Sequence, residues 1–223
     1  MPKNSAPAGT RAAAEAAALA ARLIAAESAS WKSAFADART ATGAVPDAEA
    51  VAREIRRWFA LFSPEAHARV LFEKRRAALE LMRRVPELDL RLIGVVLSGE
   101  ATERSPVELV TRAMGEKEAA ITLLSAGLEA ESFDTPWPTR FMRLRNSGSG
   151  GVRRDVITIA TSVAGETLLV RVAPPHAPLP ADEAPDETQT ALESSGSLGA
   201  QGVSALLDEM RTTTASSFFV AQD

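Results

Sequence analysis

The sequence has no cysteine, no tyrosine and only two histidines, His67 and His176. Without cysteine, neither a disulfide nor a thiolate metal site can form, and two histidines exclude a site built from several imidazoles. Apolar runs are short, and none approaches the roughly 20 residues that a membrane-spanning helix needs. The alanine-rich start of the chain is interrupted by charged residues, which is not typical of a secretory signal. We therefore expect a cytoplasmic protein that makes no membrane contact.

Charge is distributed unevenly along the 223 residues. The formal net charge is −4, but residues 175–223 hold eight Asp or Glu and one Arg, which leaves the rest of the chain at about +3. Acidic segments rich in Pro, Ser and Gly are typically solvated and lack a fixed structure. We therefore predict an acidic, mostly disordered tail over 175–223, with one short helix at 203–211.

The N-terminal part of the chain carries helical patterns. Residues 1–9 are predicted to be disordered, and residues 10–86 to form a mostly helical region. Ser30, Asp47 and Ser63 each precede an apolar pattern and can cap a helix there. The first helix, from Thr10 to about residue 29, has so little large apolar surface that we expect it to be loosely docked or marginal. The basic run at 74–76 is expected on a solvated helix surface.

The following residues, 87–174, carry strand patterns. Apolar runs at 90–97 and 107–110 predict two strands, and a helix is expected at about 116–126. Two prolines, Pro136 and Pro138, predict irregular structure over 133–139. Residues 141–145, 152–161 and 167–172 are read as further strands. The predicted fold class is α+β, with a helical N-terminal region followed by a small mixed sheet of about five strands.

The stretch from Gly94 to Val110 reads GVVLSGEATERSPVELV. It resembles the signature of the DNA polymerase β-like nucleotidyltransferases, approximately GSVARGEATPDSDIDLLV. Both glycines, Gly94 and Gly99, match, as do the EAT triplet and Ser105. Three positions depart from the family: Val95 replaces a phosphate-holding serine, while Pro106 and Glu108 replace the two metal-binding aspartates. The resemblance is specific over about 20 residues and implies a sheet of nucleotidyltransferase type.

The resemblance also implies a set of site residues. Members of this family bind two metal ions through an Asp-x-Asp pair on one strand and a third acid on a neighbouring strand. Glu108 is the residue that remains to bind a metal ion here, Mg²⁺ if the protein is active, with Asp155 or Glu166 as candidate third ligands. The nucleotide-binding residues implied for an NTP are Gly94, Gly99 and Ser105; Ser98 is a further candidate that is near in sequence but out of register with the family's serine. Alternatively, Glu108 is a solvent-facing strand residue and the glycines serve only loop geometry.

A cluster of arginines flanks the glycine- and serine-rich turn at 146–151. Its members are Arg140, Arg143, Arg145, Arg153 and Arg154. If 141–145 and 152–161 pair as a hairpin, several of these side chains gather at one sheet edge and can bind RNA or an acidic protein partner. The alternatives are protection of an edge strand by charge, and docking of the acidic tail.

Three functions follow as hypotheses. The first is a working, divergent nucleotidyltransferase that moves a nucleotidyl group from an NTP to a hydroxyl acceptor. The second, which the loss of the aspartate at position 106 favours, is a catalytically impaired member that has become a binding or regulatory module. The third is a structural subunit whose N-terminal helices mediate assembly. The acceptor, the partner and the oligomeric state are not disclosed by the sequence.

Overall fold

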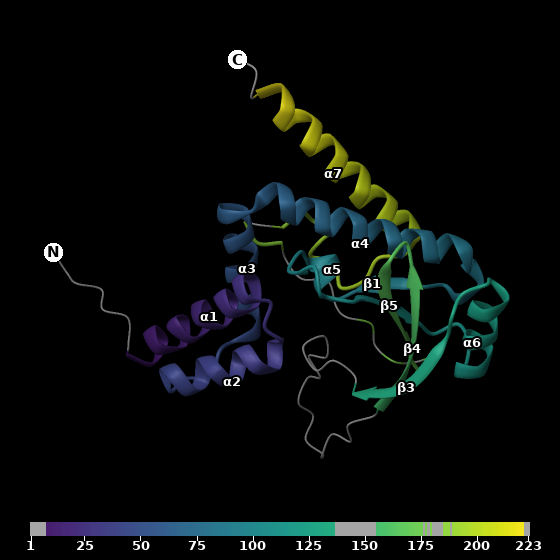
Figure 1. Cartoon of the computed structure of the whole chain (residues 1–223), viewed down its shortest axis with the longest axis horizontal. Coiled ribbons are helices and arrows are strands. Elements are labelled where there is room, and N and C mark those ends of the chain that lie inside the picture. Colours follow the sequence, from purple (N-terminus) through teal and green to yellow (C-terminus); the bar gives the residue numbers. More distant parts are fainter. Residues whose placement is uncertain are drawn as a thin grey trace. The chain divides into compact units, whose positions relative to one another are not determined.

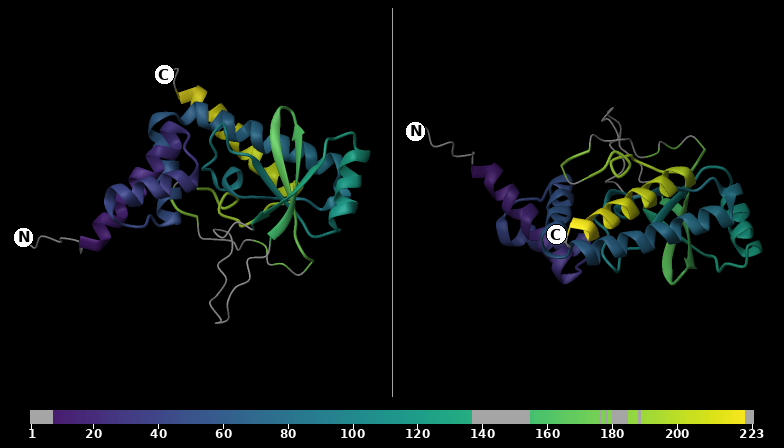
Figure 2. Two further views of the ribbon diagram at one scale, coloured as in Figure 1. Left: turned by 60° about the horizontal axis from the view of Figure 1, so that its bottom comes forward. Right: turned by 90° about the horizontal axis from the view of Figure 1, so that it is seen from above.

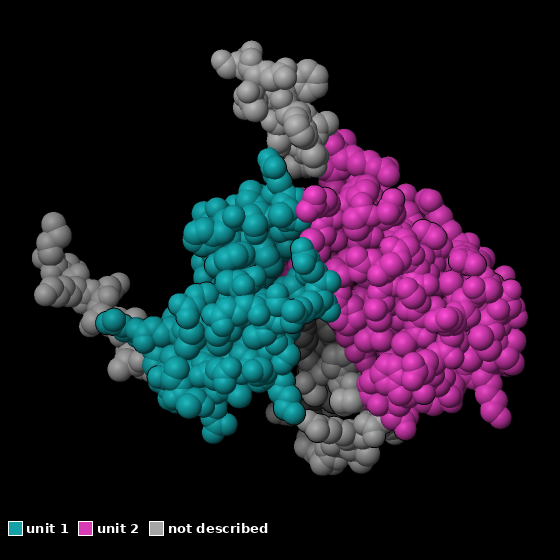
Figure 3. Space-filling model, in the orientation of Figure 1, with its two compact units in different colours: residues 1–67, 102–104 teal, residues 68–101, 105–223 magenta. Residues whose placement is uncertain are grey.

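The computed structural model describes residues 8–136, 155–175, 177, 179, 185–187 and 189–220 (Figure 1). The chain divides into two compact units, coloured separately in Figure 3. The first unit comprises residues 1–67 with 102–104, and the second comprises 68–101 with 105–223. The boundary between the units therefore falls at residue 67, near the start of a long helix, whereas the sequence suggested a boundary near residue 86. Of residues 1–9, predicted to be disordered, 1–7 lie outside the described residues, whereas 8 and 9 belong to the first helix.

Three helices form the first unit: α1 (Ala8–Glu27), α2 (Trp31–Thr42) and α3 (Ala48–Phe62). The hydroxyl of Ser30 accepts a hydrogen bond from the Ser33 amide, and the carboxylate of Asp47 accepts one from the Ala50 amide. Gly43 ends α2 with a φ of 72°. The helix starts predicted from Ser30 and Asp47 are therefore confirmed, because each side chain satisfies an amide that the helix leaves free.

Helix α1 is firmly packed, so the expectation that it is loosely docked was wrong. Its buried residues form one core with those of α2 and α3; from α1 they are Ala17, Ala20, Ala21 and Ile24. Small side chains at this spacing let helix backbones approach closely, so dispersion contacts replace the large apolar surface that α1 lacks.

The second unit contains a five-stranded mixed sheet, as predicted. Its strands are β1 (Arg91–Ile93), β2 (Val107–Thr111), β3 (Glu131–Pro136), β4 (Asp155–Val163) and β5 (Glu166–Val172). The strand order is β1-β2-β5-β4-β3, and every neighbouring pair is antiparallel except β2 with β5. The predicted helix follows the first strand pair as α6 (Glu116–Ser125). The predicted strand at 141–145 lies outside the described residues.

Helices cover one face of this sheet. Helix α4 (Pro64–Arg84) and helix α7 (Ala200–Val220) run side by side across it in both Figure 1 and Figure 2. Leu109, Ile159 and Val170 of the sheet share one apolar core with residues of α4, α6 and α7. Among the described residues, the apolar cluster on the opposite face is small and comprises Ile93, Val110 and Ala173, and polar side chains gather on that face.

Two strand predictions need correction. The apolar run 90–97 is not one strand, because Gly94 adopts φ 77° and ψ −162° and the chain then turns into the short helix α5 (Val95–Ser98). Of residues 133–139, expected to be irregular, 133–136 belong to β3 and 137–139 lie outside the described residues. This strand is at the edge of the sheet and Pro136 is its last residue, so the missing amide interrupts no interior ladder.

The C-terminal region is more ordered than its composition suggests. The predicted helix at 203–211 is confirmed, and it lies within the longer α7. Val203, Leu206 and Leu207 are at most 3% exposed, and Leu198 forms a backbone bridge with Leu92. The expected disorder therefore does not extend to 189–212, because these residues supply part of the core. Among the described residues, no helix is both long and apolar enough to cross a membrane.

Candidate functional site

The residues that resemble the nucleotidyltransferase signature form a compact turn between β1 and β2. Both glycines have positive φ, 77° at Gly94 and 91° at Gly99, and the Gly99 amide donates to the carbonyl of Val95. These conformations are accessible to glycine and strongly disfavoured for other residues. Chain geometry alone thus requires both glycines. Val95 packs against the apolar core, in keeping with its lack of a polar group.

The hydroxyl of Ser98, one of the predicted nucleotide-binding groups, is occupied within this turn. It lies 2.6 Å from a carboxylate oxygen of Glu100 and 3.1 Å from the carbonyl oxygen of Gly94. Both are acceptors, so the single hydroxyl proton is already used. Glu100 itself is only 2% exposed. Ser105, the remaining predicted residue, lies just before β2 and is partly buried.

Glu108, the predicted metal ligand, forms an ion pair with Arg171. Leu169 is aligned with Glu108 across the parallel β2–β5 pair, and Arg171 is aligned with Val110. Alternate strand residues share a face, so Glu108 and Arg171 emerge on the same side of the sheet. Arg171 Nη2 donates to Glu108 Oε1 at 2.5 Å, and the two side chains are 7% and 16% exposed. The strand that neighbours Glu108 therefore supplies a cation.

The ion pair continues into a row of polar side chains across β4 and β3. Arg171 Nη1 donates to Thr135 Oγ1 at 2.9 Å, and the hydroxyls of Thr135 and Thr158 lie 2.5 Å apart. Thr158 is fully buried, and Arg171 Nε has no hydrogen-bond partner among the described residues. Sequence reasoning missed this row. The available signal was Arg171 itself, a charged residue inside the otherwise apolar run 168–172.

The two candidate third ligands do not join Glu108. Ala160 of β4 and Glu108 of β2 are both aligned with Leu169, and Asp155 is five residues from Ala160 along β4. At about 3.3 Å per residue, this places the Asp155 backbone about 16 Å along the strand from that register. Glu166 instead pairs with Lys74 Nζ at 2.6 Å. Among the described residues, no three His, Cys, Asp or Glu side chains are grouped so that they can hold a metal ion.

A buried arginine holds the turn in place from the helical side of the sheet. Arg75 is 0% exposed; its Nε donates to the carbonyl of Val96 and its Nη2 to that of Leu97, both at 2.9 Å. The same Nη2 lies 2.8 Å from Glu193 Oε1. Burial lowers the pKa of Arg75, an effect that the charges of Glu193 and other nearby carboxylates oppose.

The prediction of a solvated basic run at 74–76 is therefore wrong for two of its three residues. Lys74 and Arg75 are at most 2% exposed, whereas Arg76 is exposed. Carboxylates distant in the sequence, Glu166 and Glu193, neutralise the two buried cations. Helical periodicity identifies which residues share a face, but it does not reveal such remote partners.

The arginine cluster of the sequence analysis, Arg140, Arg143, Arg145, Arg153 and Arg154, lies outside the described residues. The geometry of the candidate site thus rests on the Gly94–Gly99 turn and on the polar row of Glu108, Arg171, Thr135 and Thr158. In comparisons of the chain with protein-family models, curated proteins and solved structures, none matches.

Proposed function

We propose that this chain is a catalytically impaired protein with a nucleotidyltransferase-like core, which acts as a binding or regulatory module. The observation that carries the proposal is the ion pair between Glu108 and Arg171. It adds to the departure at Pro106, where the related signature has a metal-binding aspartate.

The chemistry of nucleotidyl transfer explains why this ion pair matters. Two metal ions about 3.5–4 Å apart must be held by converging carboxylates, so that one activates the attacking hydroxyl and the other stabilises the leaving group. Arg171 is almost fully buried beside Glu108, where its charge is only weakly screened and disfavours a second cation. A metal ion bound at Glu108 would have to displace a guanidinium group, with only one carboxylate to replace it.

A binding role does not require converging carboxylates or bound metal ions. The same face of the sheet presents the partly exposed Glu108 and the Nε of Arg171, which has no hydrogen-bond partner within the part of the chain that the structure describes. Arg171 Nε is a hydrogen-bond donor, and a ligand or partner that brings an acceptor would satisfy it. Such binding needs no metal ion, and this separates the proposal from an active nucleotidyltransferase.

Thermal unfolding of the full chain with each NTP, with and without Mg²⁺ or Mn²⁺, tests the proposal. A ligand at 100 times its dissociation constant stabilises by about 2.7 kcal/mol, which is a rise of several degrees for a chain of this size. We expect no stabilisation that depends on both a metal ion and a nucleotide, because Glu108 is already neutralised. Glu108→Ala should leave the response to metal ions and nucleotides unchanged.

The opposite outcome is equally well defined. A rise in Tm that needs both a metal ion and one nucleotide, and that disappears in Glu108→Ala, would show that Glu108 binds metal and would refute the proposal. Glu80→Ala, which removes an exposed carboxylate of α4, serves as the matched control for changes in net charge. A rise with nucleotide alone, unaffected by Glu108→Ala, would identify the ligand of the binding module as a nucleotide.

A further inference from the structure

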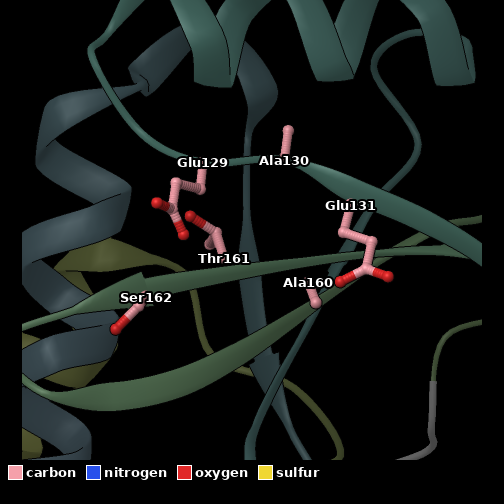
Figure 4. Close-up of a pocket in the computed structure, with 6 residues that line it drawn as sticks. All are labelled: Glu129, Ala130, Glu131, Ala160, Thr161 and Ser162. Carbon is pink, nitrogen blue, oxygen red and sulfur yellow. The ribbon is translucent and has the colours of Figure 1, made fainter.

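A recess lies at the sheet edge where β3 begins. Its volume is about 260 Å³, and it is lined by Glu129, Ala130, Glu131, Ala160, Thr161 and Ser162 (Figure 4). The β3–β4 ladder starts at the pair Glu131–Ala160, while β4 continues to Val163. The recess therefore lies beside the end of β4 that extends past the start of β3 and is not paired with it. It is separate from the polar row around Arg171.

Thr161 is the unusual residue of this recess. It is only 4% exposed, yet its Oγ1 has no hydrogen-bond partner among the described residues. A buried hydroxyl without a partner is destabilising, because it has lost water and gained nothing in return. Figure 4 shows the side chains of Thr161 and Glu129 directed toward one another. The hydroxyl thus faces the recess, where a bound group can satisfy it.

The charge of the recess defines the chemistry of that group. Two carboxylates, Glu129 and Glu131, line it, and no Lys or Arg is among its lining residues. Carboxylates only accept hydrogen bonds, and the Thr161 hydroxyl has acceptor lone pairs as well. The complementary ligand is a cation that donates several hydrogen bonds. A bare metal ion is a poorer match, because no group of three metal-binding side chains occurs among the described residues.

We propose that this recess binds a primary alkylammonium ion. An ammonium group has three N–H donors and no acceptor, and the recess offers it the Thr161 hydroxyl and the carboxylate of Glu129, which Figure 4 shows directed toward that hydroxyl. Glu131 is aligned with Ala160, the neighbour of Thr161, so its carboxylate is on the other face of the sheet and adds negative charge without a direct contact. The methyl group of Ala130 provides apolar surface for the first methylene of the alkyl chain. This site is new relative to the proposed function and does not depend on it.

Titration of the full-length protein with n-butylammonium chloride tests the proposal, with backbone amide chemical shifts as the readout. We expect saturable shifts at 129–131 and 160–162. Tetramethylammonium chloride is the matched control ion, because it has the same charge and no N–H donor, and it should give no saturable shift. Shifts of equal size with both ions would mean that the carboxylates respond only to ionic screening, and would overturn the proposal.

Two variants assign the binding to the named groups. Thr161→Val keeps the shape of the side chain and removes the hydroxyl, so affinity should fall about tenfold, as expected for a hydrogen bond to a charged group. The free variant should fold at least as stably as the parent, because valine removes an unsatisfied buried hydroxyl. Glu129→Gln should also weaken binding, and Glu80→Gln on α4 should not. Unchanged affinity in Thr161→Val would overturn the proposal.

A parallel titration with Nα-acetyl-lysine amide distinguishes two sources of the ammonium group. Tighter binding of n-butylammonium would identify a free amine as the ligand, and tighter binding of the lysine derivative would identify a protein side chain. Either result supports the ammonium chemistry. Absence of saturable binding by both compounds would refute it.

Discussion

Arg75 shows at the scale of one residue how a charge can be a core component. Its guanidinium satisfies two carbonyls at the end of α5 and pairs with Glu193, which comes from the C-terminal segment. Helix ends leave carbonyls without partners, and water does not reach these two because Arg75 is fully buried. Through Arg75, helix α4 thereby connects the Gly94–Gly99 turn to Glu193, which lies more than 90 residues further along the chain.

Replacing this residue should therefore be strongly destabilising. Arg75→Met keeps the length of the side chain but leaves the carbonyls of Val96 and Leu97, and the largely buried Glu193, without their donor. We expect the free energy of unfolding in chemical denaturation to fall by about 3–5 kcal/mol, the range for breaking a buried pair from one side. Arg76→Met is the control on the adjacent, exposed residue, where the change should stay within about 0.5 kcal/mol. Equal effects of the two substitutions would contradict this role.

At the scale of elements, the sequence identified those parts that local chemistry determines. The caps at Ser30 and Asp47 and the strands from Val107 and Thr167 depend on neighbouring residues, and the structure confirms them. The incorrect predictions of secondary structure arose where residues distant in the sequence determine the local conformation. Pro136 is compatible with β3 only because that strand is at the edge, and strand order is not visible in local patterns.

Gly94 allows a test of this local control, because it is the single residue between the end of β1 and the start of α5. Its φ of 77° and ψ of −162° lie in a region that essentially only glycine occupies. We expect Gly94→Ala to lower the free energy of unfolding by about 1–3 kcal/mol. Gly115→Ala is the matched control, since Gly115 has φ −75° and ψ 173° and precedes a helix in the same way, and it should cost less than about 1 kcal/mol. A turn that tolerates both substitutions equally would show that the positive φ is not required.

At the scale of the whole molecule, the sequence predicted the α+β class and the five-stranded mixed sheet, but not which segments complete the core. Residues 189–212 have the composition of a tail, and their few apolar side chains gain significance only once Leu198 pairs with Leu92. The candidate site was also predictable only in part. The resemblance singled out Glu108, whereas its partner Arg171 lies 63 residues later and became apparent only through the pairing of β2 with β5.

The contribution of the C-terminal helix to the core of the second unit leads to the last prediction. Leu206 of α7 is 1% exposed and belongs to the same apolar cluster as Leu81 of α4 and Leu109 of β2. Leu206→Ala should lower the free energy of unfolding by about 2–5 kcal/mol, because it removes buried methyl groups and leaves a cavity. Leu124→Ala on α6 makes the same chemical change at a side chain that is 57% exposed, so its effect should stay within about 0.5 kcal/mol. If both variants unfolded at the same denaturant concentration as the parent, α7 would not be part of the cooperative core, and the C-terminal segment would behave as the solvated tail that its composition predicts.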